Sequence, residues 1–148
     1  MSISKWAFVL AAAIMFAAGF IVRGLLSAPV AHAQTANHVF ELRTYTAAPG
    51  KLEALKTRFR DHTVKLFTKH GMKHVGYWTP ADAPQSDNTL IYVLMHDSRE
   101  AAQKSWAAFR ADPEWIKARD ASQKDGSLTA PNGVQSVFMN PTDFSPIK

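Results

Sequence analysis

The sequence predicts an α+β domain with one antiparallel sheet and helices on one side, and two observations support this fold class. Strand-like and helix-like segments follow one another in the order strand, helix, strand, strand, helix, short helix, strand. In the stretch 89–115, the run Leu90–Met95 is apolar on both sides and leads directly into a helix with an apolar stripe. Such a run is typical of a strand in the middle of a sheet, and the helix after it is expected to cover that sheet.

Residues 1–33 precede this domain and have the pattern of a targeting segment. A lysine comes before the almost wholly apolar stretch 6–22, and an Ala-His-Ala sequence ends at Ala33. We therefore expect cleavage between Ala33 and Gln34, which would leave a periplasmic or secreted domain over residues 34–148. The alternative is that residues 6–22 are kept as a membrane anchor, since 17 apolar residues are close to the length that spans a bilayer.

Composition excludes several classes of function. Loss of the targeting segment lowers the net charge from +5 to +3, because 17 basic residues fall to 15 while all 12 acidic residues remain. The basic residues of the first helix are interspersed with Glu53 and Asp61, so no nucleic-acid surface is expected. The chain has no cysteine, which excludes disulfides, thiol catalysis and cysteine-based metal sites. It also has neither a glycine-rich phosphate loop nor a Gly-x-Ser-x-Gly motif.

The first strand is expected over His38–Tyr45 because polar and apolar residues alternate there. Its apolar face carries Phe40 and Leu42, and its other face is polar and charged, with Glu41, Arg43 and Tyr45. An amphipathic helix should run from about Lys51 to Lys69, with apolar residues at three- and four-residue steps. Gly71 is expected to end it in a left-handed conformation.

The second strand is expected over Met72–Thr79, where strict alternation would place His74 and Trp78 on one face. A polar connection, 81–88, is short enough to join it to an antiparallel neighbour. After the central strand, Asp97 is expected to cap the covering helix in a capping box with Glu100.

The remaining segments complete the sheet. Asp112 and the proline after it predict the start of a second, short helix. A Pro-Asn-Gly turn at 131–133 should precede the last strand, Val134–Met139, and the tail 140–148 should run over the surface. The resulting order, βαββαβ with an extra short helix, is the ferredoxin-like arrangement with an antiparallel four-stranded sheet.

Helices on one side leave the second face of such a sheet uncovered. We expect that face to carry Leu90, Tyr92 and Leu94, whose exposure to water would be unfavourable. A homodimer that joins the two sheets would cover them and would enclose a barrel-like interior.

Six short segments, in order, support the same arrangement by resemblance. They are Glu41–Tyr45, Pro49–Leu52, His70–Gly71, Gly76–Trp78, Asp112–Trp115 and Asn140–Pro146. In these segments the chain resembles the NIPSNAP family over essentially all of 38–148. The resemblance implies a dimeric α/β barrel, a fold shared with haem-degrading and antibiotic-biosynthesis monooxygenases. Vertebrate members are described in mitochondria and in mitophagy signalling, bacterial members are mostly unassigned, and the export signal sets this chain apart.

The candidate ligand-binding residues follow from the barrel. The polar face of the first strand and side chains of the neighbouring strands would project into one space: Glu41, Arg43, Tyr45, His74, Trp78, Tyr92 and His96. Arg43 is suited to bind a carboxylate, Glu41 and the histidines could move protons, and the aromatic rings could form apolar walls. The alternative is that Glu41 and Arg43 only pair with each other as part of the scaffold.

These expectations lead to two hypotheses of function. The first is an exported homodimer that binds a small organic or anionic ligand or a partner protein, with no cofactor, no metal and no nucleic acid. A membrane would be involved only if the N-terminal segment is retained. The second is a haem-using or cofactor-independent monooxygenase or isomerase, which rests on the analogy of fold alone.

Overall fold

The computed structural model describes residues 38–148, so the expected cleavage site and apolar stretch lie outside the described part. The four strands are β1 (Val39–Ala47), β2 (Lys73–Trp78), β3 (Thr89–His96) and β4 (Thr129–Met139). The helices are α2 (Leu52–Arg58), the π-helical η1 (Phe59–Thr63), α3 (Val64–Lys69), the short 3₁₀ η2 (Gln85–Asp87), α4 (Arg99–Ala111) and α5 (Pro113–Ser122). None of the helices within 38–148 is long and apolar enough to cross a membrane.

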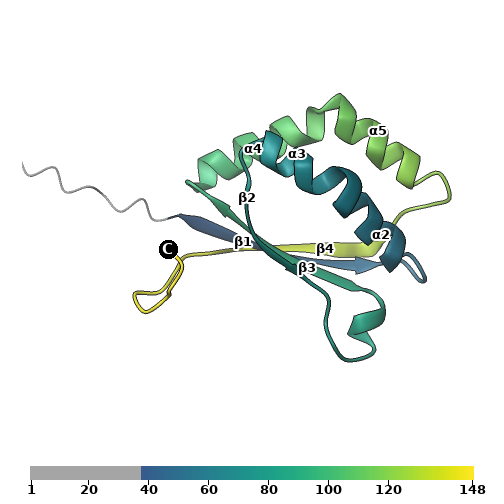
Figure 1. The fold of residues 1–148 in the computed structure, drawn as a ribbon, viewed down its shortest axis with the longest axis horizontal. Helices are drawn as coiled ribbons and strands as arrows, with labels where there is room; N and C mark the ends of the chain where they lie inside the picture. The colour runs from purple at the N-terminus through teal and green to yellow at the C-terminus, as the bar shows by residue number, and fades with distance from the viewer. Residues whose placement is uncertain (1–37) are drawn as a thin grey trace, which may run out of the picture. The chain divides into compact units, whose positions relative to one another are not determined.

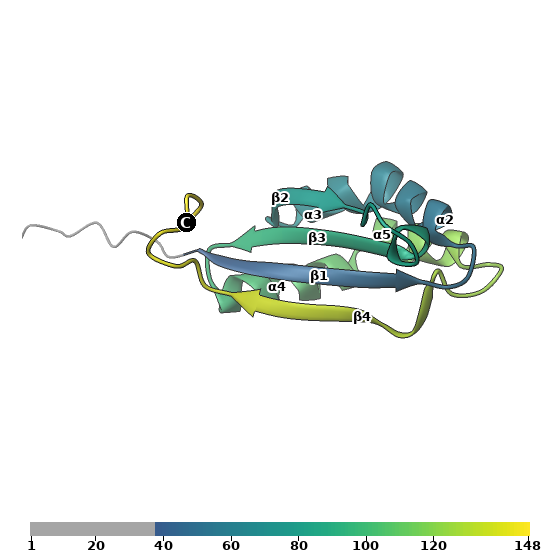
Figure 2. The same cartoon turned by 90° about the horizontal axis from the view of Figure 1, so that it is seen from below.

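The sheet has the spatial order β2-β3-β1-β4, and every neighbouring pair is antiparallel. The α-helices and η1 lie on one side of it, whereas the short η2, in the connection between β2 and β3, lies on the other side (Figures 1 and 2). This order, with the two βαβ halves sharing one sheet, confirms the ferredoxin-like α+β fold.

The first long helix is continuous and consists of α2, η1 and α3. Its expected apolar stripe is buried against the sheet, with Leu55 and Phe67 almost inaccessible. In the π-helical segment the hydroxyl of Thr63 donates to the carbonyl oxygen of Arg58 at 3.2 Å. The helix ends as predicted at Gly71, whose φ of +76° is readily adopted only by glycine.

The predicted cap of α4 is wrong by one residue. Ser98, not Asp97, caps the helix, and its hydroxyl accepts from the amide of Ala101 at 3.1 Å. Asp97 instead lies at the surface and pairs with Lys73 of the neighbouring strand at 2.8 Å. The prediction for α5 is confirmed, because Asp112 accepts from the amide of Glu114 at 2.8 Å.

The predicted faces of the central strand are reversed. Leu90, Tyr92 and Leu94 are 5%, 0% and 0% exposed and form the core beneath the helices. Because both faces of β3 are apolar, alternation could not show which one the helices cover. The helices cover the face with the larger side chains, where Tyr92 packs against Phe59 and Phe67 with ring centroids 5.2 and 5.9 Å away.

The uncovered side of the sheet, called the open face below, is apolar as well. The pairing of the strands places on it Leu42, Thr44, Trp78, Ile91, Val93, Met95 and Val137. Trp78 is 51% exposed and Val137 is 55% exposed. The expected unprotected apolar face therefore exists, but with residues other than those predicted.

Two irregularities shift the side chains of the edge strands. A bulge between His74 and Gly76 puts Tyr77 opposite Tyr92, so His74 and Trp78 lie on different faces, contrary to the predicted alternation. The last strand begins at Thr129, earlier than predicted, and includes the Pro-Asn-Gly sequence. A side chain at Gly133 would lie 2.6 Å from the carbonyl oxygen of Thr46, which explains the glycine there.

Candidate functional site

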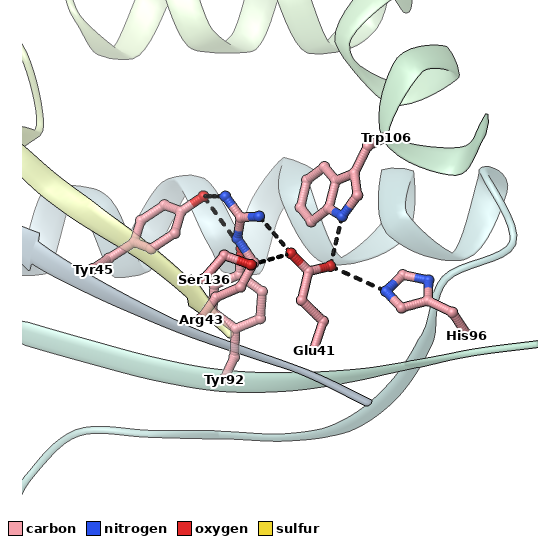
Figure 3. Close-up of polar contacts among 7 residues, drawn as sticks. All are labelled: Glu41, Arg43, Tyr45, Tyr92, His96, Trp106 and Ser136. Atoms are coloured by element: carbon pink, nitrogen blue, oxygen red, sulfur yellow. Dashed lines mark hydrogen bonds and ion pairs between the residues drawn. The ribbon is translucent and has the colours of Figure 1, made fainter. Parts of the chain in front are cut away.

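A buried carboxylate, that of Glu41, lies at the centre of the polar contacts between the sheet and the helices (Figure 3). One of its oxygens accepts from Arg43 Nη1 at 2.7 Å and from Ser136 Oγ at 2.6 Å. The other accepts from Trp106 Nε1 at 2.6 Å and from His96 Nε2 at 3.2 Å. The residue is 1% exposed, so the four donors replace the water that an ionised carboxylate requires.

The charge of Glu41 is fixed by these donors. Burial by itself raises the pKa of the carboxyl, but the hydrogen bonds from His96, Ser136, Trp106 and Arg43 together outweigh burial and lower the pKa to about 2. The carboxylate is therefore ionised at neutral pH and its lone pairs are occupied. This geometry favours the pairing interpretation of Glu41 over a role in proton transfer.

The guanidinium of Arg43 has more N–H donors than its contacts occupy. Its guanidinium stacks on the Trp106 ring, 4.3 Å from the ring centroid, and Nη2 makes a long contact of 3.4 Å with the hydroxyl of Tyr45. Its Nε–H is buried without a hydrogen-bond acceptor among residues 38–148. Although burial lowers the pKa of Arg43, the Tyr45, Tyr92 and Glu41 oxygens raise it, so the group keeps its charge.

Two phenols adjoin this guanidinium. The hydroxyl of Tyr92 donates to the hydroxyl of Tyr45 at 3.2 Å. Burial raises the pKa of Tyr92 well above its usual value, so its phenol stays neutral and can act as a donor. Arg43, Tyr45 and Tyr92 thus form a row of donors along the inner face of the sheet (Figure 3).

Arg43 and Tyr45 lie on β1, whose neighbour β4 is the edge strand of the sheet (Figure 2). Ser136 pairs with Arg43 and Val134 pairs with Tyr45 across the strands, so both point to the helix side. Nevertheless Ser136 is exposed and Val134 is 43% exposed, because the helices do not cover this edge. The Arg43 side chain beside them is 16% exposed.

The fold brings together five of the seven predicted site residues and leaves two apart. Glu41, Arg43, Tyr45, Tyr92 and His96 meet under the helices, not in the space over the open face where they were predicted. His74 lies at the β2 edge, where Nδ1 contacts the Tyr77 hydroxyl at 2.6 Å, and burial lowers its pKa. Trp78 belongs to the open face and covers Gly76.

Sequence reasoning missed two residues of the cluster. Trp106 belongs to the apolar stripe of α4 and is buried, but its indole N–H also donates to Glu41. A buried indole N–H needs an acceptor, and this requirement could have pointed to Trp106 from the sequence. Ser136 could be found only from the register of β4 against β1, which places it opposite Arg43. In the described part of the chain, no group of three His, Asp or Glu could hold a metal ion.

Comparisons with known proteins agree on one family. The NIPSNAP family model matches residues 40–146, well over half of the chain. A NIPSNAP family protein of unknown function from Agrobacterium tumefaciens is 23% identical, with a TM-score of 0.65, and the match covers 77% of this chain and 96% of that one. A NIPSNAP-like domain protein from Burkholderia xenovorans is 19% identical, with a TM-score of 0.64 and coverage of 75% and 90%.

A more distant structural match lies outside these proteins. SnoaB, a cofactor-independent oxygenase from Streptomyces nogalater, is 12% identical, with a TM-score of 0.50 and coverage of 74% of this chain and 98% of that one. At these identities the solved structures support the fold and not a shared reaction. No curated protein matches the chain.

Proposed function

The chain belongs to the NIPSNAP family, and from this premise we propose that it is an exported homodimeric domain that binds a small organic anion at Arg43. The observation that carries the proposal is the unused capacity of that guanidinium. Glu41 occupies only one of its nitrogens, Nε–H has no acceptor within 38–148, and Tyr45 adds a hydroxyl. A planar guanidinium beside phenols and an indole suits an aromatic or other planar carboxylate.

Dimerisation is proposed from the open face. Exposed Trp78 and Val137 and the half-buried aliphatic side chains between them form a contiguous apolar surface across all four strands. Stable interfaces bury about 800 Å² per partner. In a homodimer with twofold symmetry, the same face of a second copy would cover this surface.

If Arg43 binds the anion, replacing it with an uncharged residue should weaken the binding of a charged ligand. Wild-type protein is expected to bind benzoate and to discriminate against benzamide, its neutral isostere, in calorimetric titrations. The Arg43→Met variant should bind benzoate at least tenfold more weakly, because a charge-assisted hydrogen bond contributes about 1.5–3 kcal/mol. Its melting temperature should fall less than that of a Glu41→Ala variant, since Glu41 keeps three other donors.

Arg99→Met is the matched control, because Arg99 also stacks on an aromatic ring, 4.5 Å from the Phe138 centroid, but does not contact Glu41. It should bind benzoate as the wild type does. Equal binding by Arg43→Met would contradict the proposal. A large drop in its melting temperature, restored by Glu41→Gln, would show that the pair is scaffold. A Soret band on haem titration would instead favour the oxygenase hypothesis.

Export is proposed from the pattern of residues 1–33. N-terminal sequencing of the protein from its native host should begin at Gln34, because the small residues before it fit signal peptidase. Recovery of only the full-length chain, in the membrane fraction, would rule out cleavage and leave the anchor alternative.

A further inference from the structure

A second arginine, Arg58, is buried without a counter-ion. It is the last residue of α2 and is only 5% exposed. Its guanidinium lies 5.2 Å from the ring centroid of Trp115, and Nη1 makes one long contact, 3.5 Å, with the Ser122 hydroxyl. Its Nε–H is buried and has no acceptor in the described part of the chain.

The chain itself supplies no carboxylate for this group. Within 38–148, none of the ion pairs involves Arg58. Residues 1–37 contain neither aspartate nor glutamate, so they could not provide one either. Buried charges in proteins are normally paired, because an unpaired one loses its hydration without compensation. Burial lowers the pKa of Arg58, but a guanidinium remains protonated in proteins.

Arg58 lies at a groove between the first long helix and α5. The groove has a volume of about 370 Å³, and its apolar walls come from small side chains, including Ala54, Ala118 and Ala121. Its polar lining consists of Thr57, Arg58, Asp61, His62 and Ser122. A second groove of about 360 Å³ shares His62, Ala118 and Ala121 and continues past Lys65 and Lys117.

We propose that this groove binds a small aliphatic monocarboxylate, with Arg58 and Ser122 holding the carboxylate and the alanines contacting the hydrocarbon part. The planar guanidinium matches a carboxylate in shape and in charge. Asp61 adds a negative charge to the lining, which disfavours a dianion such as phosphate more strongly than a monoanion. The proposal does not rest on the proposed function, since none of the residues that line the groove belongs to the Glu41–Arg43 cluster, although the phenols of Tyr45 and Tyr92 act on both guanidinium groups.

Thermal unfolding of the full chain in butyrate, with chloride keeping the ionic strength constant, tests the proposal. The wild type should show a melting temperature that rises with butyrate and saturates, because a ligand that binds the native state stabilises it. Arg58→Met should lose the rise and should melt no lower than the wild type without butyrate, since it removes an unpaired buried charge. Arg60→Met, an exposed arginine two residues further on, should keep the rise.

Two further variants separate the outcomes. Arg43→Met should keep the rise in melting temperature with butyrate. If this variant lost the rise, butyrate would be binding at Arg43 and the proposal would be overturned. A lower melting temperature in Arg58→Met, matched by an equal loss in Asp61→Asn, would reveal an internal partner and would also overturn it. An equal rise with phosphate would contradict the assignment to monocarboxylates, and a rise that Arg58→Met retains would contradict the site.

Discussion

Replacing Glu41 with alanine is expected to destabilise the fold by about 3–5 kcal/mol, the usual cost of breaking a buried ion pair from one side. The substitution leaves the Arg43 guanidinium, the Trp106 indole N–H and the His96 imidazole without their common acceptor. All of them lie between the sheet and the helices, where water cannot fully replace the carboxylate. Equilibrium unfolding in urea measures the loss.

Glu53→Ala is the matched control for this substitution. Glu53 is an exposed glutamate whose ion pair is with Lys56, 2.7 Å away on the same helix. Surface pairs of this type contribute about 0–1 kcal/mol, so its loss should be small. An equal effect of the two substitutions would mean that the Glu41 cluster contributes no more to stability than a surface ion pair does.

The same cluster predicts acid sensitivity with a definite sign. The pKa of Glu41 is lowered from 4.5 to about 2 in the folded state, so its stabilising effect is fully present above pH 4.5. It is lost as the pH falls from there through 2, where the folded protein also takes up the proton. Urea unfolding between pH 5 and 2 should show this loss of stability in the wild type and not in Glu41→Gln.

The second large effect separates the two faces of β3. Leu94→Lys is expected to cost at least about 3 kcal/mol and to unfold much of the protein, because Leu94 is completely buried under the helices. Val93→Lys changes the adjacent residue, which faces the open side. It should leave the fold intact and weaken the proposed dimer by about 2 kcal/mol, roughly thirtyfold in Kd.

Sedimentation and circular dichroism together distinguish the outcomes of this pair. A folded Val93→Lys monomer and an unfolded or aggregated Leu94→Lys are expected. A folded Leu94→Lys monomer would restore the original face assignment. A Val93→Lys dimer as tight as the wild type would show that the open face is not the dimer interface.

The sequence by itself determined the fold class, because each element carries a local signal. The apolar run of β3, the stripe of the first long helix and the Asp112 cap each depend on neighbours within a few residues. Their order then leaves few arrangements for a four-stranded sheet. The polar face of β1 was equally local, so Glu41, Arg43 and Tyr45 could be selected as a set.

Only the tertiary structure decided which side of the sheet those residues face. Both faces of β3 are apolar, so alternation had no means of showing that the helices pack on Tyr92 and not on Val93. The bulge in β2 reversed Trp78 relative to His74, because one extra residue changes the side of every later side chain. The fourth donor to Glu41, Ser136, is 95 residues away in the chain, and the unpaired state of Arg58 depends on what α5 places beside it. Such contacts follow from packing between distant segments, which no local pattern contains.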